Sequence, residues 1–192
     1  VQKGWNMVER NIDQIAHIVQ DMLIYSKERT PSLEAVDPNE LISEVIELME
    51  EKGRISGVRI VRNMEQGIGP VFMDRTAIHR CLLNLISNAI DACTLQGIVN
   101  GSGEVTVKTE RPREWAVKFQ IVDNGTGMDR ETQEKLFTDF FTTKGYKGTG
   151  LGLPVTREIV REHGGKLTFD SRPGKGTTFT LLLPKSPPLQ ES

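Results

Sequence analysis

The hydrophobic and polar positions of the chain change period along its length, and each period predicts a different element. Within residues 1–29, apolar side chains recur at alternating spacings of four and three, which is the seam of a helix that packs against other helices. The seam residues are Val1, Trp5, Val8, Ile12, Ile15, Val19 and Met22. One helix cannot bury its own seam, so the pattern predicts a partner helix, with docking on the rest of the chain as the alternative.

Two helices and two short strands are predicted between residues 37 and 95. Asp37 followed by Pro38 is typical of a helix start, and the segment from Gly53 to Gly57 is expected to break that helix. Its apolar stripe comprises Leu41, Val45, Leu48 and Met49. Strands at 58–62 and 71–73 precede a long helix that Asp74 caps and that reaches about residue 95. Residues 30–36, after the Thr30-Pro31 helix stop, are interpreted as a linker.

The second half of the chain alternates between strands and helices. Period-2 patterns predict strands over residues 104–110, 115–123, 166–171 and 177–183. A short helix follows Asp129, and a longer one is expected from about residue 151 to residue 162. Residues 137–150 have no period, and a loop of this length inside a compact domain is usually functional or disordered. Together these patterns predict a domain over residues 37–184 and a tail over residues 185–192.

The composition is that of a globular domain. The chain has 192 residues, of which 37% are hydrophobic, and a net charge of −2. A near-neutral charge argues against non-specific nucleic-acid binding. The longest apolar run is Met22–Tyr25, far short of a membrane span, and no signal peptide is recognisable. Because the chain begins with Val1, we interpret it as a piece of a longer protein.

The two cysteines, Cys81 and Cys93, fall on one predicted helix. At a rise of about 1.5 Å per residue they lie about 18 Å apart, too far for a disulfide. Free thiols favour a reducing, cytoplasmic setting. The three histidines, His17, His79 and His163, have no metal-ligand spacing with the cysteines. His163 lies at a predicted helix end, where a cation would suit the helix dipole.

Three segments carry candidate chemistry, and the first is Asn84–Ala92 on the long helix. Projected at about 100° per residue, its side chains separate into two faces. The apolar face holds Leu82, Leu85, Ile86, Ala89 and Cys93, and the polar face holds Arg80, Asn84, Asn88 and Asp91. The polar face is either solvated or the wall of a pocket, whose amide oxygens would suit Mg²⁺.

The second segment, Asp123–Asp129, connects a predicted strand to a predicted helix. Gly125 and Gly127 permit a positive φ or a close backbone approach. The lone carboxylate of Asp123 at the strand end is suited to accept a hydrogen bond from an exocyclic amine. A plain strand-to-helix turn is the alternative.

The third segment is the loop from Phe137 and the glycine-rich run Gly148–Leu153, which leads directly into a predicted helix. Backbone N–H groups at such a start form an anion site, and Lys144 and Lys147 add positive charge. The run has neither the P-loop nor the dinucleotide-binding spacing. We expect Phe137, Phe140 and Phe141 to anchor the loop. A flexible surface loop with core phenylalanines is the alternative, and Gly174–Thr177 is interpreted mainly as a hairpin turn.

The order of these motifs is more specific than any one of them. NLISNA, DNGTGM, FTDFFTTK, GTGLGL and GKGT follow one another as in the nucleotide-binding domain of two-component sensor histidine kinases. The chain resembles that domain, a branch of the GHKL (Bergerat-type) ATPase and kinase superfamily, over about residues 37–184. The resemblance implies an α/β sandwich, with a mixed sheet covered on one face by three helices. Residues 1–29 resemble the second helix of the dimerisation bundle.

The resemblance also implies a site for ATP and Mg²⁺. Asn88 matches the Mg²⁺-binding asparagine, Asn84 lines the site one turn earlier as the other catalytic position, and Asp123 matches the aspartate that binds the adenine amine. Glycines 148, 150 and 152 would cradle the phosphates beneath a lid at residues 138–148, and Thr177 would support the adenine end. The remaining ATP-binding residues implied are Asp91, Gly125, Gly127, Lys144, Lys147, Gly148, Thr149, Gly150, Leu151 and Gly152.

The implied activity is transfer of the γ-phosphoryl group of ATP to a histidine, from which a response-regulator aspartate would take it. Hydrolytic relatives carry a glutamate base where this chain has Asn84, and an amide takes no proton, so ATP hydrolysis is expected to be very slow. His17 lacks the acidic residue and nearby proline that follow the family's phosphoacceptor. No acceptor is therefore assigned in this chain, which is not expected to phosphorylate itself.

The partners implied are ATP or ADP, the acceptor-histidine helix of the full-length kinase, a response regulator and a second copy in a homodimer. Neither nucleic acid nor, for this segment, a membrane is expected, although the full-length protein could be membrane-anchored. A serine kinase of the anti-sigma type shares the fold, and the helical seam before the domain argues against it. A non-catalytic nucleotide-sensing or dimerisation module is the second alternative.

Overall fold

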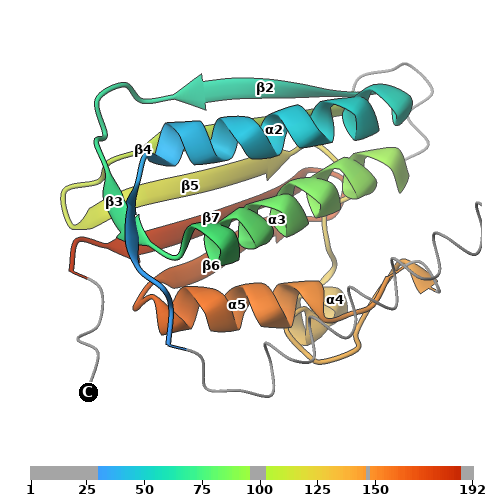
Figure 1. The fold of residues 1–192 in the computed structure, drawn as a ribbon. Helices are drawn as coiled ribbons and strands as arrows, with labels where there is room; N and C mark the ends of the chain where they lie inside the picture. The colour runs from blue at the N-terminus through green and yellow to red at the C-terminus, as the bar shows by residue number, and fades with distance from the viewer. Residues whose placement is uncertain (1–29, 96–102, 146–147, 187–192) are drawn as a thin grey trace, which may run out of the picture.

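The structure is a computed structural model that describes residues 30–95, 103–145 and 148–186 (Figure 1). The helix expected over residues 1–29, Lys147 and most of the expected tail lie outside these residues. Within the described part, a five-stranded sheet has the order β2 (Val58–Met64), β4 (Gly103–Glu110), β5 (Trp115–Asp123), β7 (Gly176–Pro184) and β6 (Lys166–Arg172), and β1 (Glu34–Val36) and β3 (Val71–Met73) form a separate two-stranded sheet.

The described elements follow the expected alternation of strands and helices. Their bounds are β1 Glu34–Val36, α2 Pro38–Ile55, β2 Val58–Met64, β3 Val71–Met73, α3 Arg75–Leu95, β4 Gly103–Glu110, β5 Trp115–Asp123, α4 Arg130–Lys135, α5 Gly152–Glu162, β6 Lys166–Arg172 and β7 Gly176–Pro184. In this part of the chain no helix has the length and apolar character needed to cross a membrane.

The large sheet is mixed, because β2 and β4 are parallel whereas the other neighbours are antiparallel. Helix α3 lies in the connection between the parallel pair, as such a crossover requires. Helices α2, α3 and α5 lie side by side on one face of the sheet, with α3 in the middle (Figure 1). The expected α/β sandwich with three helices on one face is confirmed.

The core lies between this helical layer and the sheet. Strands β4, β5 and β7 alternate between buried and half-buried positions, as the period-2 pattern predicts. The buried row of β5 ends at Asp123 and that of β7 begins at Thr177, and these two residues face each other in the β5–β7 register. A carboxylate therefore lies on the helix-covered side of the sheet.

Helix α3 divides into the two faces that the sequence predicts. Leu82, Leu85, Ile86, Ala89 and Cys93 are buried, as part of the core cluster. Asn84, Asn88 and Asp91 are half-buried on the other side. Packing the apolar face on the sheet thus holds this polar row at a fixed height above the strand ends.

Asp74 connects the start of α3 to two other parts of the chain. Its Oδ1 accepts the Ala77 N–H (2.9 Å) as a helix cap, and its Oδ2 accepts the Ser32 N–H (3.1 Å). Its own N–H donates to Nε2 of His163 at 3.0 Å. Nδ1 of that ring lies 2.7 Å from the Ile159 carbonyl oxygen, so the ring is neutral with its proton on Nδ1. The expectation that His163 is a cation at the helix end is therefore wrong.

Three local expectations are also corrected. The presumed linker contains β1, which pairs with β3. The expected break over Gly53 to Gly57 is confirmed, since α2 ends at Ile55, and a Cβ at Gly53 would meet the Val58 carbonyl oxygen at 2.9 Å. Leu48 is 60% exposed, because Ile42 and Ile46 face the core instead. Strand β2 also continues beyond its expected end to Met64.

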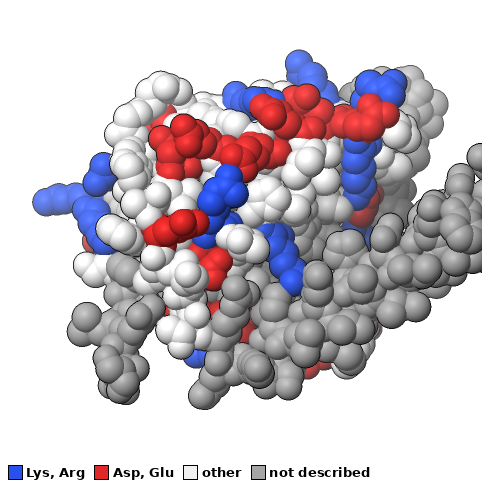
Figure 2. Space-filling view, viewed as in Figure 1, with Lys and Arg blue, Asp and Glu red and all other residues white. Residues whose placement is uncertain are grey.

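The outer side of α2 is charged. Figure 2 shows acidic side chains gathered along the upper helix of this face, with basic side chains between them. Several of these groups pair: Arg54 with Glu51, Arg62 with Glu50, and Arg75 with Glu44. Surface pairs of this kind contribute little stability, so the core and the caps hold the fold together.

We predict that Asp74→Ala lowers the free energy of unfolding by about 2–4 kcal/mol, because the buried Ala77 N–H and the half-buried hydrogen bond from Ser32 both lose their acceptor. Urea unfolding measures the loss. Asp129→Ala is the matched control, since Asp129 is an exposed cap of α4 whose side chain accepts from Thr132, and it should cost about 1 kcal/mol or less. Equal losses in the two variants would contradict the role of Asp74.

Candidate nucleotide-binding site

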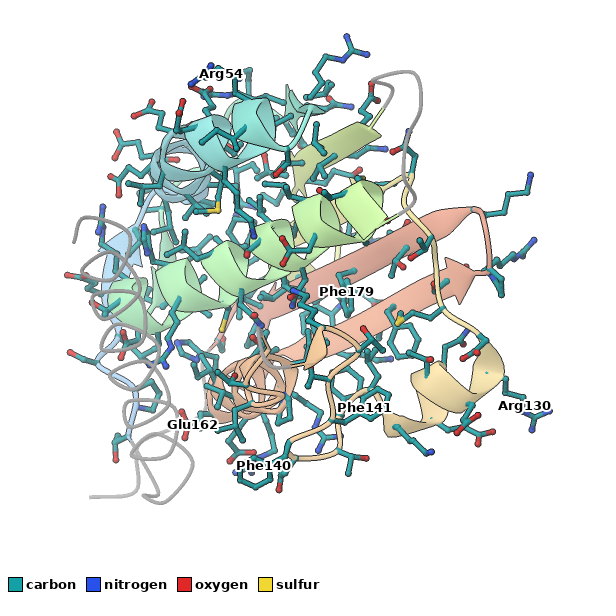
Figure 3. The ribbon with its side chains drawn as sticks, turned by 90° about the vertical axis from the view of Figure 1, so that its right-hand side faces the viewer. Arg54, Arg130, Phe140, Phe141, Glu162 and Phe179 are labelled. Carbon is teal, nitrogen blue, oxygen red and sulfur yellow. The ribbon has the colours of Figure 1, made fainter. Side chains whose placement is uncertain are left out.

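A cavity of about 990 Å³ opens between the polar face of α3, the loop that precedes α5, and the ends of β5 and β7. Asp123 and Thr177 lie at its sheet end, and Asn84 and Gly152 line it where α3 faces α5. Figure 3 looks onto this side of the molecule, with Phe179 of β7 near the centre and Phe141 on the loop. The structure thus brings the three candidate segments of the sequence around one space.

The Asp123 carboxyl is held by backbone groups. It is 4% exposed, and its Oδ1 accepts the Gly125 N–H (2.9 Å) and the Thr177 N–H (3.2 Å). Burial raises the pKa of Asp123 above its ordinary value, although both N–H donors act in the opposite direction. Since both of these hydrogen bonds end on Oδ1, Oδ2 is the oxygen that remains to meet a ligand in the cavity.

The two asparagines of α3 form a hydrogen-bonded row with α5. Asn84 Nδ2 donates to Thr156 Oγ1 at 2.9 Å, and Asn88 Nδ2 donates to Asn84 Oδ1 at 3.2 Å. Thr156 Oγ1 in turn donates to the Gly152 carbonyl oxygen at 2.8 Å. Both amides are therefore oriented, and Asn88 Oδ1 lies at the cavity end of the row.

Two lysines meet at Asp91, one turn further along α3. Lys144 Nζ lies 2.5 Å from Asp91 Oδ2 and 2.6 Å from Asn88 Oδ1, and Lys52 Nζ lies 2.6 Å from Asp91 Oδ1. Lys52 also donates to Ser87 Oγ at 2.6 Å. Burial acts to raise the pKa of Asp91, but the two lysines outweigh it and hold that pKa below its ordinary value. Asp91 is therefore a carboxylate clamped between α2 and the loop.

Sequence reasoning missed Lys52 and Thr156 as members of this site. Lys52 belongs to the last turn of α2 and Thr156 to the interior of α5, and neither lies in a recognisable motif. Lys52 contacts a residue of α3, and the partner of Thr156 lies 72 residues away. Local spacing carries no signal for either contact.

The glycines of the motifs leave room for protein atoms. A Cβ on Gly152 would strike Oδ1 of Asn84, and a Cβ on Gly127, whose φ is +63°, would strike the Arg172 carbonyl oxygen. Gly125 similarly lies against the backbone of α3 at Ala92. These positions thus require glycine first of all because other segments of the chain pass too close to leave room for a side chain.

The loop before α5 is anchored differently from the expectation. Phe137 packs on Phe169, with ring centroids 5.9 Å apart, and lies beneath the guanidinium of Arg157. Phe140 is 63% exposed with a φ of +63°, so it does not anchor the loop. Figure 3 shows its ring at the periphery, whereas Phe141 lies nearer the centre and lines the cavity.

The start of α5 borders the cavity with free backbone groups. Leu151 is its N-cap residue and offers no side-chain hydrogen bond, while its own N–H donates to Thr149 Oγ1 at 3.3 Å. Gly148, Thr149, Gly150 and Gly152 line the cavity. The positive end of the helix dipole therefore points toward this space.

The oxygens near Asn88 suit a hard cation. Among the described residues, no cluster of three or more His, Cys, Asp or Glu side chains is placed to hold a metal by itself. Asn88 Oδ1 already accepts from an ammonium group, that of Lys144, beside the Asp91 carboxylate. Neutral amide oxygens that complete their coordination with phosphate oxygens are a typical setting for Mg²⁺.

Both cysteines are buried, unpaired thiols on α3, as expected. Burial raises the pKa of Cys81 to about 12 and that of Cys93 to about 11. Such thiols are inert and belong to the core beneath the cavity.

Comparison with known proteins gives one family for this fold and site. Residues 73–187 match the family described as "Histidine kinase-, DNA gyrase B-, and HSP90-like ATPase". The chain is 33% identical over 186 residues to the signal transduction histidine-protein kinase AtoS of Escherichia coli strain K12, covering 97% of this chain and 29% of AtoS. It is 32% identical over 178 residues to the sensor histidine kinase ZraS of the same strain, covering 93% of this chain and 37% of ZraS. The chain thus spans well under half the length of these curated relatives.

A solved structure agrees with these sequences. The catalytic domain of histidine kinase ThkA, in a nucleotide-free form, is 34% identical with a TM-score of 0.68, covering 80% of this chain and 96% of that chain. ThkA in complex with the response regulator protein TrrA is 33% identical with a TM-score of 0.74, covering 95% of this chain and 50% of that chain.

We predict that Gly127→Ala costs more folding free energy than Gly57→Ala. Both residues have a positive φ, but a Cβ at Gly57 would meet no atom within 4 Å. Gly57→Ala should lose about 1–2 kcal/mol through backbone strain alone. Gly127→Ala should lose more, because the Cβ must also displace the Arg172 carbonyl. Urea unfolding of both variants measures the difference, and similar losses would contradict the packing role of Gly127.

Proposed function

The chain belongs to the histidine kinase-, DNA gyrase B- and HSP90-like ATPase family, and we propose that it is the ATP-binding catalytic region of a sensor histidine kinase. It would transfer the γ-phosphoryl group of ATP to a histidine in two-component signal transduction. The observation that carries the proposal is the buried, backbone-held Asp123 carboxyl at one end of a cavity whose other end meets the uncapped start of α5. One end suits an amine donor and the other suits phosphates.

The adenine would lie at the sheet end of the cavity. Asp123 would accept a hydrogen bond from its exocyclic amine, and Thr177, which lies beside Asp123 in the register, would support that carboxyl. Gly125 and Gly127 would hold the turn around the base. This arrangement favours adenine over a base that presents a carbonyl oxygen at the same position, because an acceptor would then face an acceptor.

The phosphates would lie at the start of α5. The N–H groups of Thr149, Gly150 and Gly152 and the helix dipole would attract the negative charge, and Lys144, with Lys147, would add cations. Lys144 now contacts Asp91, and the phosphates would compete with the Asp91 carboxylate for the ammonium group of Lys144. Lys52 would then keep Asp91 neutralised from the side of α2.

Asn88 would hold Mg²⁺ through Oδ1, the atom that now accepts from Lys144. The ion would supply charge neutralisation at the phosphates. Asn84 would hold the Asn88 amide in place and line the site without taking a proton. The chain's own contribution is then to position the nucleotide and to exclude water beneath the loop.

The acceptor histidine, a response regulator and a second copy of the chain are the proposed partners. The relatives AtoS and ZraS are named as histidine kinases, and ThkA is named in complex with a response regulator. The proposed reaction uses ATP, so we place it in the cytoplasm. Acid-labile phosphate on a separately supplied acceptor helix would support this assignment, whereas acid-stable phosphoserine would favour a serine kinase and no transfer would favour a nucleotide-sensing module.

We predict that ADP affinity falls as the pH drops through the raised pKa of Asp123. An amine donor favours the ionised carboxyl, so protonation competes with binding, by up to about tenfold per pH unit. Asp123→Asn should bind roughly 10- to 100-fold more weakly, because a charged acceptor is lost, and it should show no such pH dependence. Calorimetric titration from pH 4 to pH 8, at about one-unit intervals, measures both effects.

The stability of the same variant separates binding from folding. Since the pKa of Asp123 is raised in the folded chain, its stabilising contribution is lost as the pH rises through that value. Asp123→Asn should therefore be no less stable than the parent at neutral pH. Undiminished ADP binding by a folded Asp123→Asn variant would contradict the proposed adenine site.

We predict slow ATP hydrolysis, about 10²- to 10⁴-fold below that of relatives with a carboxylate base at the Asn84 position. The amide of Asn84 hydrogen-bonds Thr156 and Asn88 and takes no proton. Phosphate release by the purified chain measures the rate. Brisk release that disappears in Asn84→Ala would show that Asn84 supports hydrolysis, contrary to this prediction.

A further inference from the structure

Thr156 is a buried polar residue of α5 that belongs to none of the nucleotide-binding motifs. Its side chain is 2% exposed, and its hydroxyl contacts the Gly152 carbonyl oxygen and the Asn84 amide. A helical threonine often donates to the carbonyl oxygen four residues earlier, so the Gly152 contact alone indicates no special role for Thr156. The contact with Asn84, on a different helix, points to a further role.

The direction of each hydrogen bond in this row follows from its two ends. The Gly152 carbonyl only accepts, so it takes the single hydrogen of the Thr156 hydroxyl. Thr156 Oγ1 can then only accept from Asn84, which must present its NH₂ group. Asn84 Oδ1 is thereby directed to the other side, where it accepts from Asn88 Nδ2. Asn88 Oδ1 consequently faces the cavity.

The other end of the row agrees with this direction. Asn88 Oδ1 contacts the Lys144 ammonium, a group that only donates. The row therefore runs from a pure donor, through two amides and a hydroxyl, to a pure acceptor. An amide has nearly the same shape in its two flipped orientations, so the hydrogen-bond partners decide which atom faces the cavity.

We propose that Thr156 is a positioning residue that fixes Asn88 Oδ1 as the cation-binding atom of the site. This inference rests on the proposed nucleotide function, and it adds a residue that acts through Asn84 without touching nucleotide or metal. Without the hydroxyl, Asn84 loses the acceptor for its NH₂ group, and only the Lys144 end of the row still favours the present orientation. If Asn84 flips, Asn88 must flip with it, and an NH₂ group then faces the bound cation.

Gly152 ties this row to the phosphate end of the cavity. A Cβ at Gly152 would strike Asn84 Oδ1, so the start of α5 and the asparagines of α3 are in contact. The carbonyl of the same glycine accepts from Thr156. Gly152 thus connects the glycine-rich loop to α5, and its carbonyl oxygen is also the acceptor at the end of the row that sets the orientation of the Asn84 amide.

The test compares Thr156→Val, which removes the hydroxyl at nearly constant volume, with Thr156→Ser, which keeps it. Thr180→Val is the matched control, since Thr180 contacts Gln120 from β7, outside the cavity lining. Calorimetry measures ADP binding in EDTA, and electron paramagnetic resonance measures Mn²⁺ binding to the ADP-loaded chain. We expect Mn²⁺ affinity to fall roughly 10- to 100-fold in Thr156→Val, as for other supporting partners of metal ligands. ADP binding in EDTA should persist in all variants, and Thr156→Ser and Thr180→Val should keep the parent Mn²⁺ affinity.

The outcomes separate this inference from the proposed function. A parent chain that fails to bind ADP would overturn the nucleotide function itself. Normal ADP binding with parent-like Mn²⁺ affinity in a folded Thr156→Val variant would overturn the role of Thr156 alone, as would an equal loss in Thr156→Ser. If Thr156→Val does not fold, Thr156→Ala replaces it, because alanine also offers Asn84 no acceptor, and an unchanged Mn²⁺ affinity there would equally reject the role.

Discussion

The burial of the apolar face of α3 is the interaction on which the site depends. Leu82, Leu85 and Ile86 lie fully within the core, so the helix can neither rotate nor slide without exposing them. The polar row of the same helix is then fixed above the ends of β5 and β7. Because α2 and α5 flank α3 on the same side of the sheet, each reaches this row from one side, with Lys52 and Thr156 respectively (Figure 1).

The site combines rigid and loop-borne parts that differ in chemistry. Asp123 sits in a strand register and is held by backbone N–H groups, so its position is set by the sheet. Lys144 comes from the loop and is held by side-chain contacts with Asn88 and Asp91. A ligand phosphate can replace those contacts without disturbing the core. In the proposed function, the end of the cavity that would bind the base is thus preorganised, whereas the end that would bind the phosphates can rearrange.

The glycines of the motifs are explained by packing as well as by the proposed ligand binding. Gly125 and Gly152 are glycines because α3 passes within contact distance, and the N–H of Gly125 is itself donated to Asp123 Oδ1. A glycine motif can therefore resemble a phosphate-binding loop although its glycines are required first by packing against other parts of the protein. Thr156 illustrates the converse, since a residue outside every motif fixes the polarity of those inside.

Most of the helices and strands, and most of the candidate site residues, were predictable from local patterns in the chain. The alternation in β4, β5 and β7, the two faces of α3 and the caps at Asp37 and Asp74 are local patterns that the structure reproduces. The resemblance to histidine kinases rests on motif order, which also needs no tertiary information. These features were predictable because each depends on residues that are close together in the chain.

Features that depend on residues far apart in the chain could be seen only in the folded structure. The pairing of β1 with β3, the exposure of Leu48 and the neutral ring of His163 each depend on which surface packs against them. The Asp91 clamp and the direction of the Asn84 amide likewise require residues from other elements. Hydrogen-bond polarity is a property of the whole row, so no single position in the sequence reveals which atom of Asn88 faces the cavity.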